Sequence, residues 1–272
     1  MELICPICGQ ALQRCEREYR CGNRHSFDIA RQGYVNLLTV QQKKSLHPGD
    51  TREQVLSRRA FLDENHYFPI ADTLCRTAAE LDAKGPVLDI GCGEGYYSTK
   101  LAAALNTELI GLDISKEAVR VAAAKYKNAL WLCATAAHLP IADRSVGCIT
   151  SLFALTMPEE FKRVLKPDGL YFQVLAAQDH LLGLKSIIYP ELKLKEKISV
   201  PQLPGFQLVR SVPIRFSFTV EGNQVRNLLS MTPHVYRISR EGAARLAATE
   251  SLTDTASAVL NVYRPITGET HA

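Results

Sequence analysis

The chain has 272 residues, of which 46% are apolar and 22% are charged. This composition is that of an ordinary globular protein, and it excludes a disordered, collagen-like or coiled-coil chain. No apolar run approaches the roughly 18 residues that a membrane-spanning helix needs, and the first residues lack the basic and apolar regions of a secretion signal. We therefore expect a cytoplasmic protein without membrane contacts, with room for one large domain and a small module.

The net charge of +4 is unevenly distributed along the chain. Residues 1–60 hold ten Lys or Arg against six Asp or Glu, whereas the rest of the chain holds 22 of each. A basic N-terminal region suits a polyanionic partner such as a nucleic acid, although an ordinary solvated surface fits the same numbers.

The N-terminal region carries a metal-binding pattern. Cys5 and Cys8 are followed by Cys21 and His25, which gives the spacing C-x2-C-x12-C-x3-H. Two turns can bring four such ligands around one tetrahedral zinc ion and leave no open position, so we predict a structural zinc. Cys15 lies in the middle of the connecting hairpin and is expected to stay free, and the alternative is a set of reduced cysteines without metal.

Residues 1–36 form the expected zinc ribbon, and residues 37–84 are expected to connect it to the rest of the chain. Within that connection, residues 41–50 are polar and predict a loop. A helix is predicted to begin after Thr51, whose hydroxyl suits an N-cap, and a second helix is predicted over 68–81.

Residues 85–272 are predicted to form a Rossmann-like, doubly wound α/β domain, because short apolar runs alternate with helical segments. Strands are predicted at 87–90, 108–112, 130–133, 147–152 and 170–174, with helices at 96–104, 116–126 and 158–164. Farther along, the predictions are a helix over 180–189, strands at 206–210, 216–220 and 258–263, and helices at 222–230 and 240–248.

A glycine-rich loop follows the first strand of this domain, with the pattern D-x-G-x-G-x-G formed by Asp89, Gly91, Gly93 and Gly95. Glycines there allow a ligand to approach the backbone closely, and Asp89 is expected to orient the loop by bonding to its backbone. Asp113 ends the next strand, where a carboxylate can accept hydrogen bonds from ribose hydroxyls. The pattern favours S-adenosylmethionine, while NAD(P) and a loop that only turns the chain are the alternatives.

The stretch LPIADRS at 139–145 resembles class I S-adenosylmethionine-dependent methyltransferases. Many of those enzymes have an Asp shortly before the LP pair that bonds the adenine amine. This chain has ATAAH at 134–138 instead, so Thr135 or backbone groups are expected to replace that contact.

Further motifs extend the resemblance over nearly the whole chain. They are the Cys/His ribbon, FD-x-A-x-x-GYVNLL (27–38), PGD (48–50), RRAFLD-x-x-HY (58–67), DIGCGEGYY (89–97) and LLSMTP (228–233). Together they resemble the RlmA family of 23S ribosomal RNA guanine-N1 methyltransferases. The resemblance implies a zinc ribbon on a methyltransferase domain, guanine N1 in 23S rRNA as the methyl acceptor, and a homodimer. We expect the guanine to lie in a hairpin loop, because a base leaves its paired or stacked state there at the lowest cost.

The resemblance also implies cofactor contacts from Tyr67, Gly93, Glu94 and His180, each of which lies in a matching motif. Asp179 is a conceivable base for removing the guanine N1 proton, because it is acidic and precedes His180.

Two departures from the family lie on the side of the fold that faces the methyl acceptor. Leu155 and Ala176 stand where family members commonly have proline. A methyltransferase acting on a small molecule or protein, and a non-catalytic RNA-binding relative, therefore stay open as alternatives. If the ribbon and its basic flank hold RNA, a chain beginning near Lys43 should keep the cofactor site.

Overall fold

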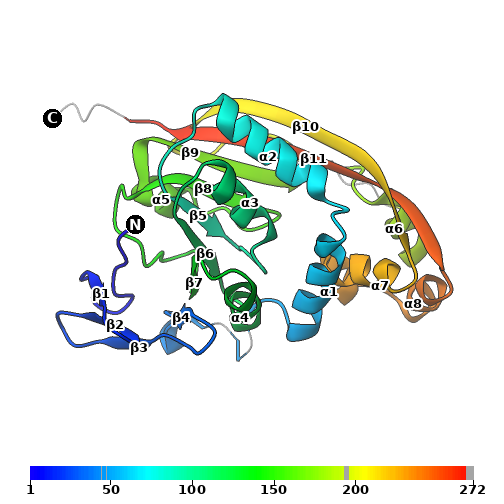
Figure 1. Ribbon diagram of the computed structural model, residues 1–272. Coiled ribbons are helices and arrows are strands. Elements are labelled where there is room, and N and C mark those ends of the chain that lie inside the picture. The colour runs from blue at the N-terminus through cyan, green and yellow to red at the C-terminus, as the bar shows by residue number, and fades with distance from the viewer. Residues whose placement is uncertain (44, 47, 193–195, 268–272) are drawn as a thin grey trace.

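A computed structural model describes residues 1–43, 45–46, 48–192 and 196–267 of the chain. The N-terminal strands β1 (Leu12–Arg14), β2 (Glu18–Cys21) and β3 (Ser26–Asp28) form a small antiparallel sheet (Figure 1). The other strands are β4 (Tyr34–Asn36), β5 (Val87–Ile90), β6 (Leu109–Asp113), β7 (Leu130–Cys133), β8 (Val146–Leu152), β9 (Leu165–Ala176), β10 (Phe206–Glu221) and β11 (Ser251–Pro265). Their order in one large sheet is β10-β11-β9-β8-β5-β6-β7-β4.

The helices alternate with the strands in the middle of the chain and cluster near its C-terminus. They are α1 (Arg52–Asp63), α2 (Phe68–Glu80), α3 (Tyr96–Ala104), α4 (Lys116–Lys125), α5 (Pro158–Val164), α6 (Leu182–Ile188), α7 (Asn223–Ser230) and α8 (Arg240–Ala247), with 3-10 helices η1 (Val40–Gln42) and η2 (Pro233–Tyr236). Strands β4 to β9 pair in parallel, whereas β11 and β10 are antiparallel. The predicted Rossmann-like α/β class is confirmed.

The two helices ahead of the domain begin as their sequences predict. The Thr51 hydroxyl accepts a hydrogen bond from the Gln54 N–H, and the Gln54 side chain accepts one from the Thr51 N–H, which satisfies two otherwise unpaired donors at the start of α1. Pro69 lies in the first turn of α2, where its missing N–H costs no helical hydrogen bond.

Strand β10 is longer than its sequence predicts. The two expected strands at 206–210 and 216–220 are one continuous strand, in which Pro213 pairs with Val259. A proline is tolerated there because β10 is the edge strand of the sheet, so its outer side needs no N–H donor. The β10–β11 pair also extends past the end of β9 and carries α7, η2 and α8 between its two strands (Figure 1).

The ribbon is packed against the sheet and is not a free arm. Leu88 and Ile90 of β5 share one apolar cluster with Leu3, Leu12 and Tyr19 of the ribbon. The Ile4 N–H also donates to the Pro140 carbonyl, and the Ala142 N–H donates to the Glu2 carbonyl, each at 3.0 Å.

The segment after the ribbon continues into the large sheet, because β4 pairs in parallel with β7. A chain beginning near Lys43 would therefore lack β4 and the ribbon side chains that cover one apolar face of the sheet. None of the described helices combines the length and apolar character needed to cross a bilayer.

Candidate functional site

The four predicted metal ligands meet at one point in the ribbon. The thiol sulfurs of Cys5, Cys8 and Cys21 and a ring nitrogen of His25 all lie within 4.8 Å of one another. A tetrahedral zinc would place sulfurs about 3.8 Å apart and sulfur and nitrogen about 3.5 Å apart. The observed Cys8–Cys21 separation is 3.7 Å, and His25 Nδ1 lies 3.5 Å from Cys5 Sγ and 3.4 Å from Cys21 Sγ. The donor set therefore fits zinc, while Cys15 is exposed and outside the cluster.

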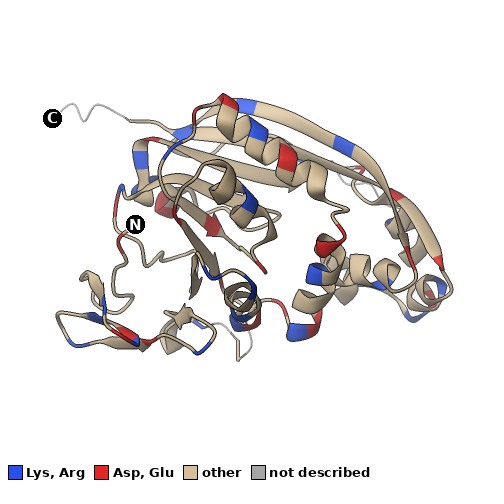
Figure 2. Cartoon of the chain, in the orientation of Figure 1, with Lys and Arg blue, Asp and Glu red and all other residues tan. Residues whose placement is uncertain are grey.

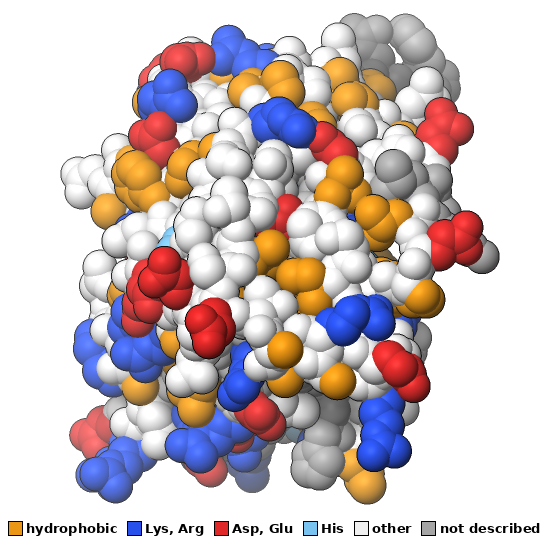
Figure 3. All heavy atoms as spheres, turned by 90° about the vertical axis from the view of Figure 1, so that its right-hand side faces the viewer, with side chains coloured by type: hydrophobic (Ala, Val, Ile, Leu, Met, Phe, Trp, Pro, Cys, Tyr) orange, Lys and Arg blue, Asp and Glu red, His pale blue; other side chains and the backbone are white. Residues whose placement is uncertain are grey.

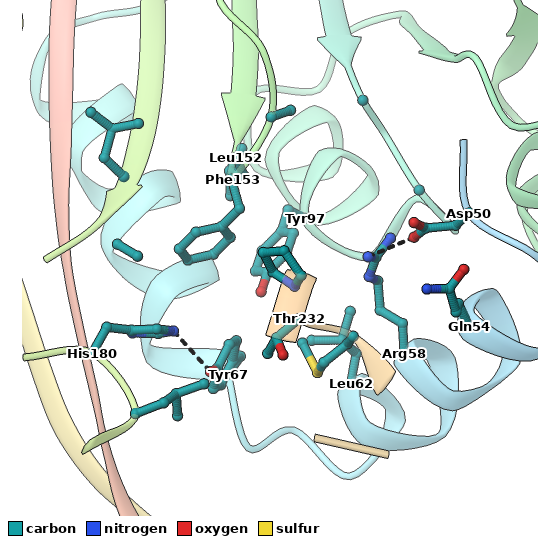
Figure 4. A pocket seen from close by; sticks show the side chains of 18 of the residues that line it. Asp50, Gln54, Arg58, Leu62, Tyr67, Tyr97, Leu152, Phe153, His180 and Thr232 are labelled. Carbon is teal, nitrogen blue, oxygen red and sulfur yellow. Dashed lines mark hydrogen bonds and ion pairs between the residues drawn. The ribbon is translucent and has the colours of Figure 1, made fainter. Parts of the chain in front are cut away.

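A second site lies at the carboxyl ends of strands β5, β8 and β9. There the structure has a cavity of about 680 Å³, a size common for small-molecule sites. Residues from α1, the loop before α2, the loop after β5, the start of α3, α6 and η2 complete its walls (Figure 4). Segments from residue 50 to residue 236 are thus brought together around one space.

The glycine loop forms one wall of this cavity. Gly91 has φ +71°, and a Cβ there would lie 2.6 Å from the Ala154 side chain. Gly95 has φ +85°, and a Cβ there would lie 2.4 Å from the Trp131 indole. A larger residue at either position would force the loop away from the sheet, so the glycines hold its backbone close to the cavity.

Asp113 and Asp89 make contacts that the sequence does not predict. Asp113 accepts the Gly93 N–H at 2.9 Å and the Ser115 N–H at 2.8 Å, and it is not among the residues lining the cavity. Asp89 accepts the Thr150 hydroxyl at 2.7 Å, and burial raises the pKa of Asp89 to about 6. Among the described residues, the carboxylate that orients the loop backbone is therefore that of Asp113.

Glu94 carries an unpaired carboxyl group at the cavity wall. Its side chain is 1% exposed, and neither oxygen has a hydrogen-bond partner among the described residues. Burial raises the pKa of Glu94 to about 7, a change that the charges of Lys125 and Arg58 oppose. A buried polar group without a partner is costly, so this carboxyl is available to a ligand.

Tyr67 and His180 meet across the cavity, as the dashed line in Figure 4 marks. Tyr67 Oη lies 3.4 Å from His180 Nε2, and the Ser257 N–H donates to His180 Nδ1 at 3.1 Å. Burial lowers the pKa of His180 to about 4, so the ring is neutral and carries its proton on Nε2. The Tyr67 hydroxyl then accepts from His180 and keeps its own proton to donate to a ligand.

Asp179 does not line the cavity. It forms an ion pair with Arg215, and hydrogen bonds, first from Ser257, hold the pKa of its carboxyl below the ordinary value. Both observations argue against Asp179 as the base that removes a proton from a substrate in the cavity.

The structure also places Thr135, Leu155 and Ala176 relative to the cavity. Thr135 accepts the Ala137 N–H at 3.2 Å and does not line the cavity, so it makes no wall for an adenine there. Of the two departures from family prolines, Ala176 lines the cavity, whereas Leu155 is exposed beside it.

Several residues that line the cavity are not predicted from the sequence. Arg58 of α1 pairs with Asp50 at 2.7 Å beside the glycine loop, and Gln54 shares hydrogen bonds with Tyr236 of η2. Asp50 and Arg58 lie in the PGD and RRAFLD motifs, so these motifs could have identified both as candidate site residues. Figure 2 shows that the basic residues of the first 60 positions occupy α1 as well as the ribbon, so the excess charge reaches the cavity.

The chain matches known proteins over both of its parts. Residues 3–46 match the family described as RlmA, N-terminal, and residues 87–169 match the methyltransferase domain. The chain is 33% identical over 278 residues to 23S rRNA (guanine(748)-N(1))-methyltransferase of Streptomyces fradiae, with 97% of each chain covered. A Micromonospora griseorubida protein, provisionally named as a 23S rRNA (guanine-N(1)-)-methyltransferase, is 33% identical over 290 residues, again 97% of each.

A solved structure shares the fold of the large domain. A provisionally assigned type II methyltransferase of Anaeromyxobacter dehalogenans superposes with a TM-score of 0.52 and 17% identity, over 71% of this chain and 95% of that one. The near full-length relatives, the ribbon match and the methyltransferase match agree with the zinc cluster and the glycine-walled cavity. The chain therefore belongs to the RlmA family of 23S rRNA (guanine-N1)-methyltransferases, with S-adenosylmethionine as methyl donor and a structural zinc in its ribbon.

Proposed function

We propose that this chain transfers a methyl group from S-adenosylmethionine to N1 of a guanine in a hairpin loop of 23S rRNA. The observation that carries the proposal is the similarity to the Streptomyces fradiae enzyme over 97% of both chains, ribbon and methyltransferase domain together. A homodimer acting in the cytoplasm belongs to the same proposal, on the strength of the family.

The cofactor would occupy the part of the cavity beside the glycine loop. Gly91 and Gly93 allow it to lie against the backbone, and the unpaired Glu94 carboxyl suits its ammonium group. Tyr67, supported by His180, offers a hydroxyl donor from the opposite wall. Asp89 contributes a buried carboxyl at the base of the site, and Asp113 acts by fixing the Gly93 backbone.

Phe153 is the aromatic face that the target base would meet. It follows β8 with φ +55°, is 42% exposed and lines the cavity, with its ring centroid 5.9 Å from that of His180 (Figure 4). A non-glycine residue with positive φ is uncommon and is often kept where function requires it. A guanine leaving its stack in a loop can stack on such a ring.

In the reaction, guanine N1 forms a bond to the methyl carbon while the methyl–sulfur bond breaks, and S-adenosylhomocysteine leaves with the bonding electrons. The N1 proton is lost, which leaves a neutral 1-methylguanine. The protein's part is to hold the two reactants in line and to keep water out.

A competition experiment tests this function. Protein with methyl-labelled S-adenosylmethionine would be offered unmodified 23S rRNA transcript and, separately, a small-molecule extract and a protein extract. We expect label in the transcript alone, recovered as 1-methylguanosine after digestion. Label only in small molecules or proteins would support the rival substrate class, and no label would support a non-catalytic relative.

A further inference from the structure

The cavity has two chemically different ends. The loop end carries the carboxyl groups of Asp89 and Glu94. The far end, formed by α6, η2 and the segment before β10, carries Lys185, Lys197 and His234. We call these three residues the basic end, and nothing in the cofactor's placement at the glycine loop accounts for it.

Lys185 is the central group of the basic end. It lies on α6, half-buried, and no hydrogen bond or ion pair joins its ammonium to the part of the chain that the structure describes. Burial, and then the charge of Lys197, lowers the pKa of Lys185. A partly desolvated ammonium beside a second one is unfavourable until an anion joins them.

The nearby carboxylates are already engaged. Asp254 accepts the N–H groups of Gly183 at 3.0 Å and Leu184 at 2.7 Å, at the start of α6. Asp179 is paired with Arg215. Neither arrangement supplies a direct partner for the Lys185 ammonium, so the compensating anion would come from outside the described chain.

The His234 ring contributes no positive charge at this end. Its Nδ1 lies 2.8 Å from the Tyr189 hydroxyl, and burial lowers its pKa, so the ring is neutral near pH 7. The loop end has its own cation, Arg58, which lies beside Gly93 and pairs with Asp50. The Lys185 ammonium is therefore available to bind an anionic group of the methyl acceptor.

We propose that Lys185, with Lys197 beside it, binds a backbone phosphate of the RNA strand that delivers the target guanine. The inference rests on the proposed function. A phosphodiester at the basic end would leave the attached base free to reach Phe153, whose ring contacts His180, a residue close enough for the charge of Lys185 to act on it. On the face that carries α1 and α7, acidic and basic side chains are interspersed and form no single basic patch (Figure 3). A phosphate bound inside the cavity would therefore fix the position of the RNA strand relative to the cavity.

The test compares Lys185→Met with Lys84→Met in the full chain. Lys84 is exposed and lies just before β5, at the opposite edge of the sheet from the cavity, so its removal subtracts the same charge elsewhere. Binding of unmodified 23S rRNA transcript would be measured over a salt series, and S-adenosylmethionine binding by calorimetry. We expect Lys185→Met to bind the transcript roughly tenfold more weakly and to lower the salt slope by about 0.7–0.9, with unchanged cofactor affinity. Lys185→Arg should restore the slope.

Each other outcome overturns the assignment in a distinct way. An unchanged salt slope with a lower methylation rate would place the lysine at the reacting base and not at a phosphate. A parallel loss of cofactor affinity would place it in the cofactor site. If the wild-type protein neither binds nor methylates the transcript, the proposed function itself fails; if it does both and Lys185→Met matches Lys84→Met, only the phosphate site fails.

Discussion

The zinc centre and the cavity are built in opposite ways. All four zinc ligands lie within the first 25 residues, and their donor atoms already meet at the spacing that a metal ion requires. The cavity draws its walls from residues 50 to 236, and within the described part of the chain the Glu94 carboxyl has no hydrogen-bond partner. A closed donor set marks a structural site, whereas unpaired buried groups around an open space mark a site that awaits ligands.

The largest expected effect concerns the zinc centre. Cys21→Ser should lose the metal and unfold the ribbon, because structural zinc sites contribute of the order of 10 kcal/mol. Since ribbon side chains share a cluster with β5, the large domain should lose thermal stability as well. Metal analysis and thermal unfolding check this, with Cys15→Ser as the control that keeps zinc. Full zinc content in Cys21→Ser would contradict the ligand assignment.

At the cavity, Asp113→Ala should weaken S-adenosylmethionine binding roughly tenfold to a hundredfold. The substitution removes two charge-assisted bonds to the loop backbone, each worth about 1.5–3 kcal/mol at most when buried. Calorimetry measures the affinity, and circular dichroism monitors the fold. An unaltered affinity would show that the loop does not need the carboxylate of Asp113.

Phe153→Ala should raise the KM for the transcript about tenfold or more, because stacking contributes about 1–3 kcal/mol per base. Phe153→Tyr keeps the ring and should behave as wild type, while cofactor affinity should be the same in all three proteins. Steady-state kinetics with transcript as the varied substrate checks this. Equal KM values for the alanine and tyrosine variants would remove Phe153 from the acceptor site.

The smallest expected effect is a pH dependence of cofactor binding. The pKa of Glu94 is raised to about 7, so the carboxyl ionises between about pH 6 and 8, and a cationic cofactor favours the ionised form. Affinity should therefore rise roughly tenfold over that interval, and Glu94→Gln should flatten the profile. Calorimetry at pH 6, 7 and 8 provides the measurement, and an unaltered profile in the variant would assign the titration to another group.

The raised pKa of Glu94 also makes the folding stability depend on pH. This dependence has the opposite sign to that of the cofactor affinity. In the free protein the carboxyl of Glu94 binds its proton more tightly than in the unfolded chain, whose ordinary pKa is 4.5. Its contribution to folding is therefore lost as the pH rises from 4.5 through about 7.

The sequence predicts the contiguous features well and the assembled ones poorly. The zinc spacing and the glycine loop are legible because each is one short segment whose residues meet by local turns. At the basic end, Lys185 on α6 and His234 on η2 line the same cavity, a placement that depends on how the long β10–β11 pair carries η2. No local pattern encodes that placement.

The contacts of two predicted site carboxylates could not be read from the sequence. Asp113 has the position expected of a ribose ligand, but the PGD segment lies over the end of β6, where the Ser115 hydroxyl donates to the Asp50 carbonyl at 2.7 Å. Asp179 precedes a cavity residue in sequence, yet its side chain turns to Arg215 on β10. Gly93 lies 20 residues from Asp113 and Arg215 lies 36 residues from Asp179, so no local pattern predicts either contact.

The proposed activity of this chain is methylation of N1 of a guanine in 23S rRNA. The most direct measurement is to map modified nucleotides in 23S rRNA from cells with and without the gene, since N1 methylation blocks the Watson–Crick edge and stops reverse transcription. We expect one guanine in a hairpin loop whose reverse-transcription stop disappears when the gene is removed and returns when the wild-type chain is restored. An identical modification pattern in both cell lines would contradict it.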